Sequence, residues 1–160
     1  MLFSTDERRS GTRTILFAVY AAALFAATLL KGQLSIGDVW DVESHHQRSI
    51  DVELFNGFSD APVWWGPWLN TVGNVALFIP LGVFVALAWN EGTGRSLLRA
   101  GGVGALTSAV IETAQYVFAV GYSDVDDLVC NTVGAVMGAW GARRVVQSRM
   151  IQRQGELSAR

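Results

Sequence analysis

Four long apolar runs, separated by polar segments, dominate the hydropathy pattern of the chain. A helix needs roughly 20 mainly apolar residues to cross a bilayer. The runs predict membrane-spanning helices at about residues 14–31, 70–89, 97–120 and 126–145, a loop at 32–69, and tails at 1–13 and 146–160. Pro80 lies inside the second run, where neighbouring helices can satisfy the freed carbonyl, so we expect a kink and not a helix end. The pattern predicts an all-α bundle of four transmembrane helices in a single domain.

The first apolar run also fits the alternative of a signal peptide, because Arg8, Arg9 and Arg13 precede it. However, its 17 apolar residues at 14–30 exceed the usual length of the apolar region of a signal peptide. No clean small-residue cleavage site follows it. We therefore expect an uncleaved first transmembrane helix.

Composition supports a membrane protein. Apolar residues make up 51% of the chain and charged residues 16%, against about 25% charged residues in soluble domains. The net charge of −2 gives no indication of a nucleic-acid partner. The single cysteine, Cys130, excludes an intramolecular disulfide and a paired-cysteine zinc motif. The sequence contains no recognisable metal-binding motif and identifies no cofactor.

The distribution of charge predicts the orientation of the helices. Ten of the twelve lysine and arginine residues lie in the two tails, at the end of the fourth run, or near the connection between the second and third runs. The loop at 32–69 and the turn at 121–125 are acidic instead. Because basic residues remain on the cytoplasmic side, both termini are expected there. Five of the six tryptophans lie at predicted helix ends, where indole rings favour the membrane interface.

Polar residues inside the apolar runs fall at one predicted depth, near the outer side. At 100° per residue, Gly104, Ser108, Glu112 and Gln115 share one face of the third helix within about 80°. On the fourth helix the corresponding stripe is Asp124, Asp127, Asn131, Gly134 and Gly138, and on the second it includes Asn70 and Asn74. Small residues let helices approach closely, so the pattern predicts a bundle closed by glycine on the inside and open around polar groups on the outside.

Each polar residue has a simpler interpretation as well. Asn74 and Asn131 fit hydrogen bonds between helices, which contribute about 0.6 kcal/mol on average. The three aspartates fit a solvated turn and a helix N-cap, above all Asp126, which lies off the stripe. His45 and His46 fit a solvated loop. Glu112 is hardest to explain in this way, because an acid within a membrane span is costly and usually functional. We expect it to titrate at raised pH or to pair with a cation such as Arg48.

Three separated motifs, HHQRSIDVELF, GNVALFIPLGVFV and IETAQYVFAVGYSDVDDLVCNTVGAVMG, resemble the VanZ family of bacterial membrane proteins. The resemblance covers roughly residues 14–144. It implies a small helical protein of the bacterial plasma membrane, and the family's founding member is associated with low-level resistance to teicoplanin-type glycopeptides. By position it implies functional roles for His46, Gln47, Arg48, Ser49, Asn74, Glu112, Gln115, Asp124, Asp127 and Asn131. The tail after the fourth helix is shorter than the family pattern.

Two main functions remain open on these residues. The first is binding or protection of a lipid-linked cell-wall precursor or a lipoglycopeptide at the outer leaflet, with membrane lipid as a partner. The second is a hydrolase or transferase acting on such lipids, with Glu112 and Asp127 as an acid–base pair or with Glu112, Asp124 and His46 around a divalent metal. A proton-coupled transporter is a weaker third, because the polar residues stop halfway across the membrane. Four short helices bury little surface, which also allows a homodimer.

Overall fold

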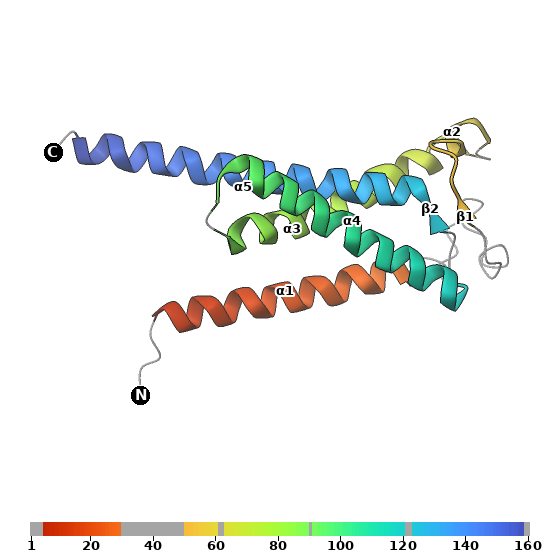
Figure 1. The fold of residues 1–160 in the computed structure, drawn as a ribbon, viewed down its shortest axis with the longest axis horizontal. Coiled ribbons are helices and arrows are strands. Elements are labelled where there is room, and N and C mark those ends of the chain that lie inside the picture. The colour runs from red at the N-terminus through yellow and green to blue at the C-terminus, as the bar shows by residue number, and fades with distance from the viewer. Residues whose placement is uncertain (1–4, 30–49, 61–62, 90, 121–122, 159–160) are drawn as a thin grey trace.

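The computed structural model describes residues 5–29, 50–60, 63–89, 91–120 and 123–158. They form helices α1 (Thr5–Leu29), α2 (Gly57–Asp60), α3 (Gly66–Ala88), α4 (Thr93–Phe118) and α5 (Val125–Ser158), and strands β1 (Ile50–Asp51) and β2 (Ser123–Asp124). The all-α class is confirmed (Figure 1). Two stretches of the described residues, Gly11–Leu29 and Gly66–Ala88, are long and apolar enough to cross a membrane.

The start of α3 and the end of α4 each have a local feature that is common at helix ends. Pro67 occupies the first turn of α3, where its missing N–H costs nothing. The helix continues through Pro80 to Ala88. At the end of α4, Ala119 has a left-handed backbone with φ of 51°, and the N–H of Val120 donates to the carbonyl of Gln115, a common way to close a helix.

The helices are longer than the apolar runs that predict them. α1 begins nine residues before the predicted start at 14, and α5 continues past residue 145 to Ser158. The segment beyond 145 is rich in Arg, Gln and Met, which favour helix regardless of hydropathy. Most of the predicted tail at 146–160 is therefore helical.

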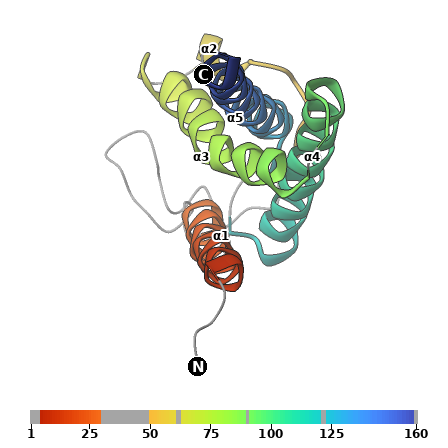
Figure 2. The ribbon, with the colours of Figure 1, turned by 90° about the vertical axis from the view of Figure 1, so that its left-hand side faces the viewer.

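α3, α4 and α5 pack closely together, and α1 lies beside this group (Figures 1 and 2). α1 contacts the group through the cluster of Leu24 with Phe78, Leu81 and Ile111 and through Tyr20, whose hydroxyl donates to the carbonyl of Leu77 at 2.8 Å. Many apolar side chains along α1 remain exposed. The tight part of the fold is therefore the group of three helices.

Glycine sets the distance between α3 and α5. A Cβ atom added at Gly134 would meet the carbonyl oxygen of Val75, and one added at Gly138 would meet that of Ile79. From the other side, a Cβ at Gly82 would meet the carbonyl of Ala135. At each of these three glycines, a Cβ atom would lie much closer to a backbone carbonyl oxygen of the other helix than van der Waals contact allows. The predicted role of Gly134 and Gly138 in close helix approach is confirmed.

Two short strands pair the middle of the predicted loop with the turn between α4 and α5. β1 and β2 pair in parallel, with Ile50 opposite Ser123 and Asp51 opposite Asp124. The sequence analysis did not predict them, since two residues are too few to produce a period-2 pattern. The pairing places the segment that follows residue 49 directly beside the acidic turn.

The glycine contact yields a stability prediction. We expect Gly138→Ala to lower the melting temperature of the detergent-solubilised protein by several degrees, because a new Cβ must push α3 away from α5. A fluorogenic maleimide can follow unfolding, since the free Cys130 is buried in the folded protein. Gly141→Ala is the matched control: it lies on the same helix with nothing near its Cβ position, and alanine favours helix by about 1 kcal/mol over glycine. Equal melting temperatures for the two variants would contradict the packing account.

Candidate functional site

Polar side chains from three helices meet at the end of the molecule that carries β1 and β2. We refer to them as the polar cluster, which comprises Asn70 and Asn74 of α3, Ser108, Glu112 and Gln115 of α4, Asp124 of β2, and Asp127 and Asn131 of α5. Most are buried, and the faces on which they lie are those expected from helical periodicity. The predicted convergence of the three polar stripes is therefore observed.

Asp127 joins α5 to α3. Its Oδ1 atom accepts hydrogen bonds from the side-chain amides of Asn70, at 2.8 Å, and Asn74. Both Asp127 and Asn74 are buried, and a buried carboxylate is costly unless donors surround it. Asn74 therefore forms a hydrogen bond between helices, as its simpler interpretation predicted, and the acceptor is the carboxylate of Asp127.

Glu112 connects the outer part of α4 to the turn before α5. Its Oε2 atom accepts the backbone N–H of Asp124 at 2.8 Å, and the hydroxyl of Ser123 donates to its backbone carbonyl at 3.2 Å. The residue is only 9% exposed. Within the part of the chain that the structure describes, no cation forms an ion pair with Glu112.

Two amide side chains in the cluster have unsatisfied oxygens. The Nδ2 atom of Asn131 donates to the hydroxyl of Ser108 at 2.9 Å, and the Nε2 atom of Gln115 donates to the carbonyl of Thr28 at 3.2 Å. The Oδ1 atom of Asn131 and the Oε1 atom of Gln115 are buried, and no donor among the described residues reaches them. Because most buried polar atoms in proteins are hydrogen-bonded, these two acceptors stand out.

Asp124 and Asp126 fix the start of α5. Oδ1 of Asp124 accepts the N–H of Asp126 at 2.8 Å, which is the geometry of an N-cap. The carboxylate of Asp126 accepts the N–H of Phe55, at 2.9 Å and 3.0 Å to its two oxygens. Phe55 has a left-handed backbone with φ of 58°, which is uncommon for a bulky residue. The Asp126 carboxylate holds this turn against α5.

The expectation that Asp126 is solvated is wrong: the residue is buried. Asp126 does lie off the stripe that Asp127, Asn131 and Gly134 form on α5. However, residues 50–60 return to cover that side of α5, which helical periodicity alone cannot reveal. Asp126 therefore binds Phe55 of the loop segment through its carboxylate, and its backbone N–H donates to Asp124 of the polar cluster.

Electrostatics at this end favour a ligand that donates hydrogen bonds. Burial raises the pKa of Asp124 to about 6, and the charges of Asp127, Asp126 and Asp51 add to the rise. By contrast, hydrogen bonds from the side chain of Asn56 and the N–H of Glu53 lower the pKa of the exposed Asp51. The described groups that remain open are acceptors, so hydroxyl, amide or ammonium groups are the chemical complement.

Four of the expected site residues, His46, Gln47, Arg48 and Ser49, lie outside the described residues. Among the described residues, no three His, Cys, Asp or Glu side chains are placed to bind a metal ion. Asn70 and Ser108 belong to the polar cluster but were not among the site residues expected from the sequence. Asn70 lies one turn before Asn74 on the same face, so periodicity contained the signal for it, whereas Ser108 was interpreted only as a small packing residue.

The raised pKa of Asp124 predicts a pH dependence of stability. The folded protein binds a proton at Asp124 that the unfolded chain releases between the ordinary value of 3.8 and about 6. Stability should therefore fall as pH rises through that window. We expect the melting temperature in detergent to decrease from pH 4.5 to pH 7. Asp124→Asn keeps a capping oxygen but cannot ionise, so it should show a smaller decrease. An unchanged pH dependence in this variant would show that Asp124 is not responsible.

Comparison with known proteins gives a consistent result. A family model described as VanZ/LLP1 matches residues 17–147. Protein VanZ from Enterococcus faecium is 29% identical over 123 residues, which cover 77% of this chain and 68% of that protein. No solved structure matches the chain. The match spans α3, α4, both strands and all of the polar cluster.

Proposed function

This chain belongs to the VanZ/LLP1 family, and from that premise we propose that it is a four-helix protein of the bacterial plasma membrane that binds an amphiphile at the outer leaflet. The ligand is a lipid-linked cell-envelope molecule or a lipoglycopeptide, and the polar cluster holds its headgroup. The observation that carries the proposal is the convergence of buried polar groups from three helices with two acceptors left open. Packing alone does not require these groups.

The arrangement of the helices supports the proposed topology. The start of α1, the end of α5 and the connection from α3 to α4 lie at one end of the molecule, and β1, β2 and α2 lie at the other (Figure 1). α3 has 23 residues and α4 has 26, which at 1.5 Å per residue exceeds the roughly 30 Å of a hydrocarbon core. The basic residues concentrate at the first end, so we place that end in the cytoplasm.

Arg48 is the proposed contact for an anionic part of the ligand. It lies two positions before Ile50 in the sequence, and Ile50 pairs with Ser123 beside Glu112 and Asp124. Since a chain spans at most about 3.6 Å per residue, we propose that this short distance along the sequence allows Arg48 to reach a ligand held by the polar cluster. Its guanidinium suits phosphate or carboxylate. We assign supporting roles to the neighbouring His46, Gln47 and Ser49, and contacts with hydroxyl or amide groups to the described acceptors.

Aromatic side chains beside the cluster fit the membrane interface. Trp64 is 81% exposed, and Trp65 and Trp68 are exposed too. Phe58 of α2 packs edge-on against Trp68, with ring centroids 5.1 Å apart. Amphipathic rings of this kind favour the headgroup level of a bilayer. We propose that they hold the apolar part of the ligand and anchor this end in the outer leaflet.

The alternative of a hydrolase or transferase gains no specific support. Asp127 already accepts two side-chain amides through one oxygen, which suits a positioning group better than a proton carrier. A metal-assisted version would need His46, because the described residues do not form a group of three metal ligands. Binding is therefore the function that these contacts support best.

The binding proposal predicts a resistance phenotype. In a susceptible host that expresses the protein, we expect Arg48→Ala and Glu112→Gln each to abolish low-level teicoplanin resistance at unchanged membrane abundance. The first removes the proposed anion contact, and the second replaces the carboxyl group whose Oε2 atom accepts the N–H of Asp124. Arg149→Ala and Glu53→Gln are matched controls at exposed positions. Retained resistance would overturn the assignment of these residues. Turnover of a polyprenyl-linked substrate by the purified protein, lost in Glu112→Gln, would replace binding by catalysis.

A further inference from the structure

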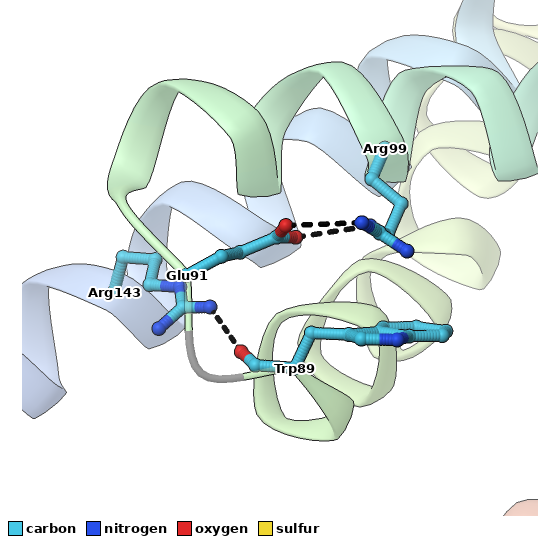
Figure 3. A network of polar contacts seen from close by, with 4 residues as sticks. All are labelled: Trp89, Glu91, Arg99 and Arg143. Carbon is cyan, nitrogen blue, oxygen red and sulfur yellow. Dashed lines mark hydrogen bonds and ion pairs between the residues drawn. The ribbon is translucent and has the colours of Figure 1, made fainter.

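We propose that the end of the bundle opposite the polar cluster holds a second site, which binds a phosphate anion through Arg143. The site lies where the end of α3, the start of α4 and the middle of α5 come together (Figure 3). It uses none of the residues of the polar cluster. The inference therefore does not depend on the function proposed above.

Arg143 is buried without a carboxylate partner. It is 7% exposed, and its Nη2 atom donates to the carbonyl of Trp89 at 2.5 Å. Its Nε atom is buried and has no acceptor. A guanidinium carries five N–H donors and remains charged. Among the described residues, the carbonyl of Trp89 is a neutral acceptor for Nη2, Nε has no acceptor, and no carboxylate balances the positive charge.

The nearby carboxylate is already paired with another arginine. Glu91 accepts from Nε and Nη2 of Arg99 at 3.0 Å and 3.1 Å, and its carboxylate points toward Arg99 (Figure 3). The guanidinium of Arg99 also stacks over the ring of Trp89, 4.5 Å from its centroid. Among the described residues, none forms an ion pair with Arg143. Because an unpaired buried charge is strongly unfavourable, a counterion from outside the chain is the missing partner.

A second buried donor lies in the adjoining turn of α4. The hydroxyl of Ser96 is fully buried and has no partner. Gln147 of α5 donates to the hydroxyl of Thr93 at 3.0 Å, and Ala100 packs in one cluster with Ala139. These two contacts fix the antiparallel register of α4 and α5, and they place Ser96 in the turn that faces Arg143.

The start of α4 adds further donors. Its N-cap is Gly92, which offers no side chain to bond the first-turn N–H groups. Free N–H groups and the positive end of the helix dipole attract anions. Arg95 and Arg144 increase the positive charge at this end, where Arg144 lies over the ring of Trp140 at 5.3 Å. A tetrahedral anion with several acceptor oxygens complements this set of donors better than a single water molecule.

The phosphate can come from a phospholipid headgroup or from solution, and one experiment separates them. The full-length protein in neutral detergent is titrated with phosphatidic acid, with diacylglycerol carrying the same tails, and with inorganic phosphate against chloride. Native mass spectrometry counts bound lipid, and the melting temperature reports stabilisation. We expect phosphatidic acid or inorganic phosphate to bind at least tenfold more tightly than its phosphate-free control. A response to the lipid alone assigns the headgroup as ligand, and a response to inorganic phosphate assigns the free anion.

Variants decide whether Arg143 carries this binding. We expect Arg143→Met to weaken it at least tenfold and Arg149→Met, on the exposed part of α5, to leave it unchanged. If Arg143→Met fails to fold, Arg143→Lys and Ser96→Ala replace it, since each removes donors while keeping the positive charge. Both should weaken binding severalfold. Equal binding by wild type and all Arg143 and Ser96 variants, or no preference for phosphate over the controls, would overturn the proposal.

Discussion

The close contact between the backbones of α3 and α5 is the constraint on which the rest of the fold depends. Gly82, Gly134 and Gly138 bring the two helices to a separation at which a single added methyl group would strike a carbonyl oxygen. With that separation fixed, Asp127, about two turns before Gly134 on α5, reaches the amides of Asn70 and Asn74. The glycine contact thereby positions the polar cluster without taking part in it.

α5 connects two regions of opposite chemistry. Near its start, carboxylates and amide oxygens leave acceptors open, and near residue 143 a guanidinium and a hydroxyl leave donors open. Between them the helix is lined by glycine and alanine, which bury no polar atom beyond the backbone. This separation suits a membrane protein, in which polar chemistry is confined to the two interfaces and small residues pack the middle.

Periodicity predicted much of the cluster, because the polar and small residues of α3, α4 and α5 repeat at helical spacing over long segments. Asn74, Glu112, Asp127 and Asn131 could therefore be assigned to facing stripes before any coordinates existed. Periodicity did not predict the burial of Asp126, because its partner Phe55 lies 71 residues away in the sequence. It did not predict the pairing of β1 with β2 either, because these strands are too short to produce a pattern. The burial of Arg143 was not predicted either, because it depends on how three helices meet. Long-range contacts of this kind leave no local signal.

The central claim is that the polar cluster faces the outside of the cell. Labelling of single cysteines in intact cells with a membrane-impermeant maleimide tests it directly. In a Cys130→Ser background, Glu53→Cys lies beside the cluster and Gln152→Cys lies on the far part of α5, and both positions are exposed. We predict that Glu53→Cys is labelled in intact cells and that Gln152→Cys is labelled only after permeabilisation. The reverse pattern would place the cluster in the cytoplasm and contradict the account.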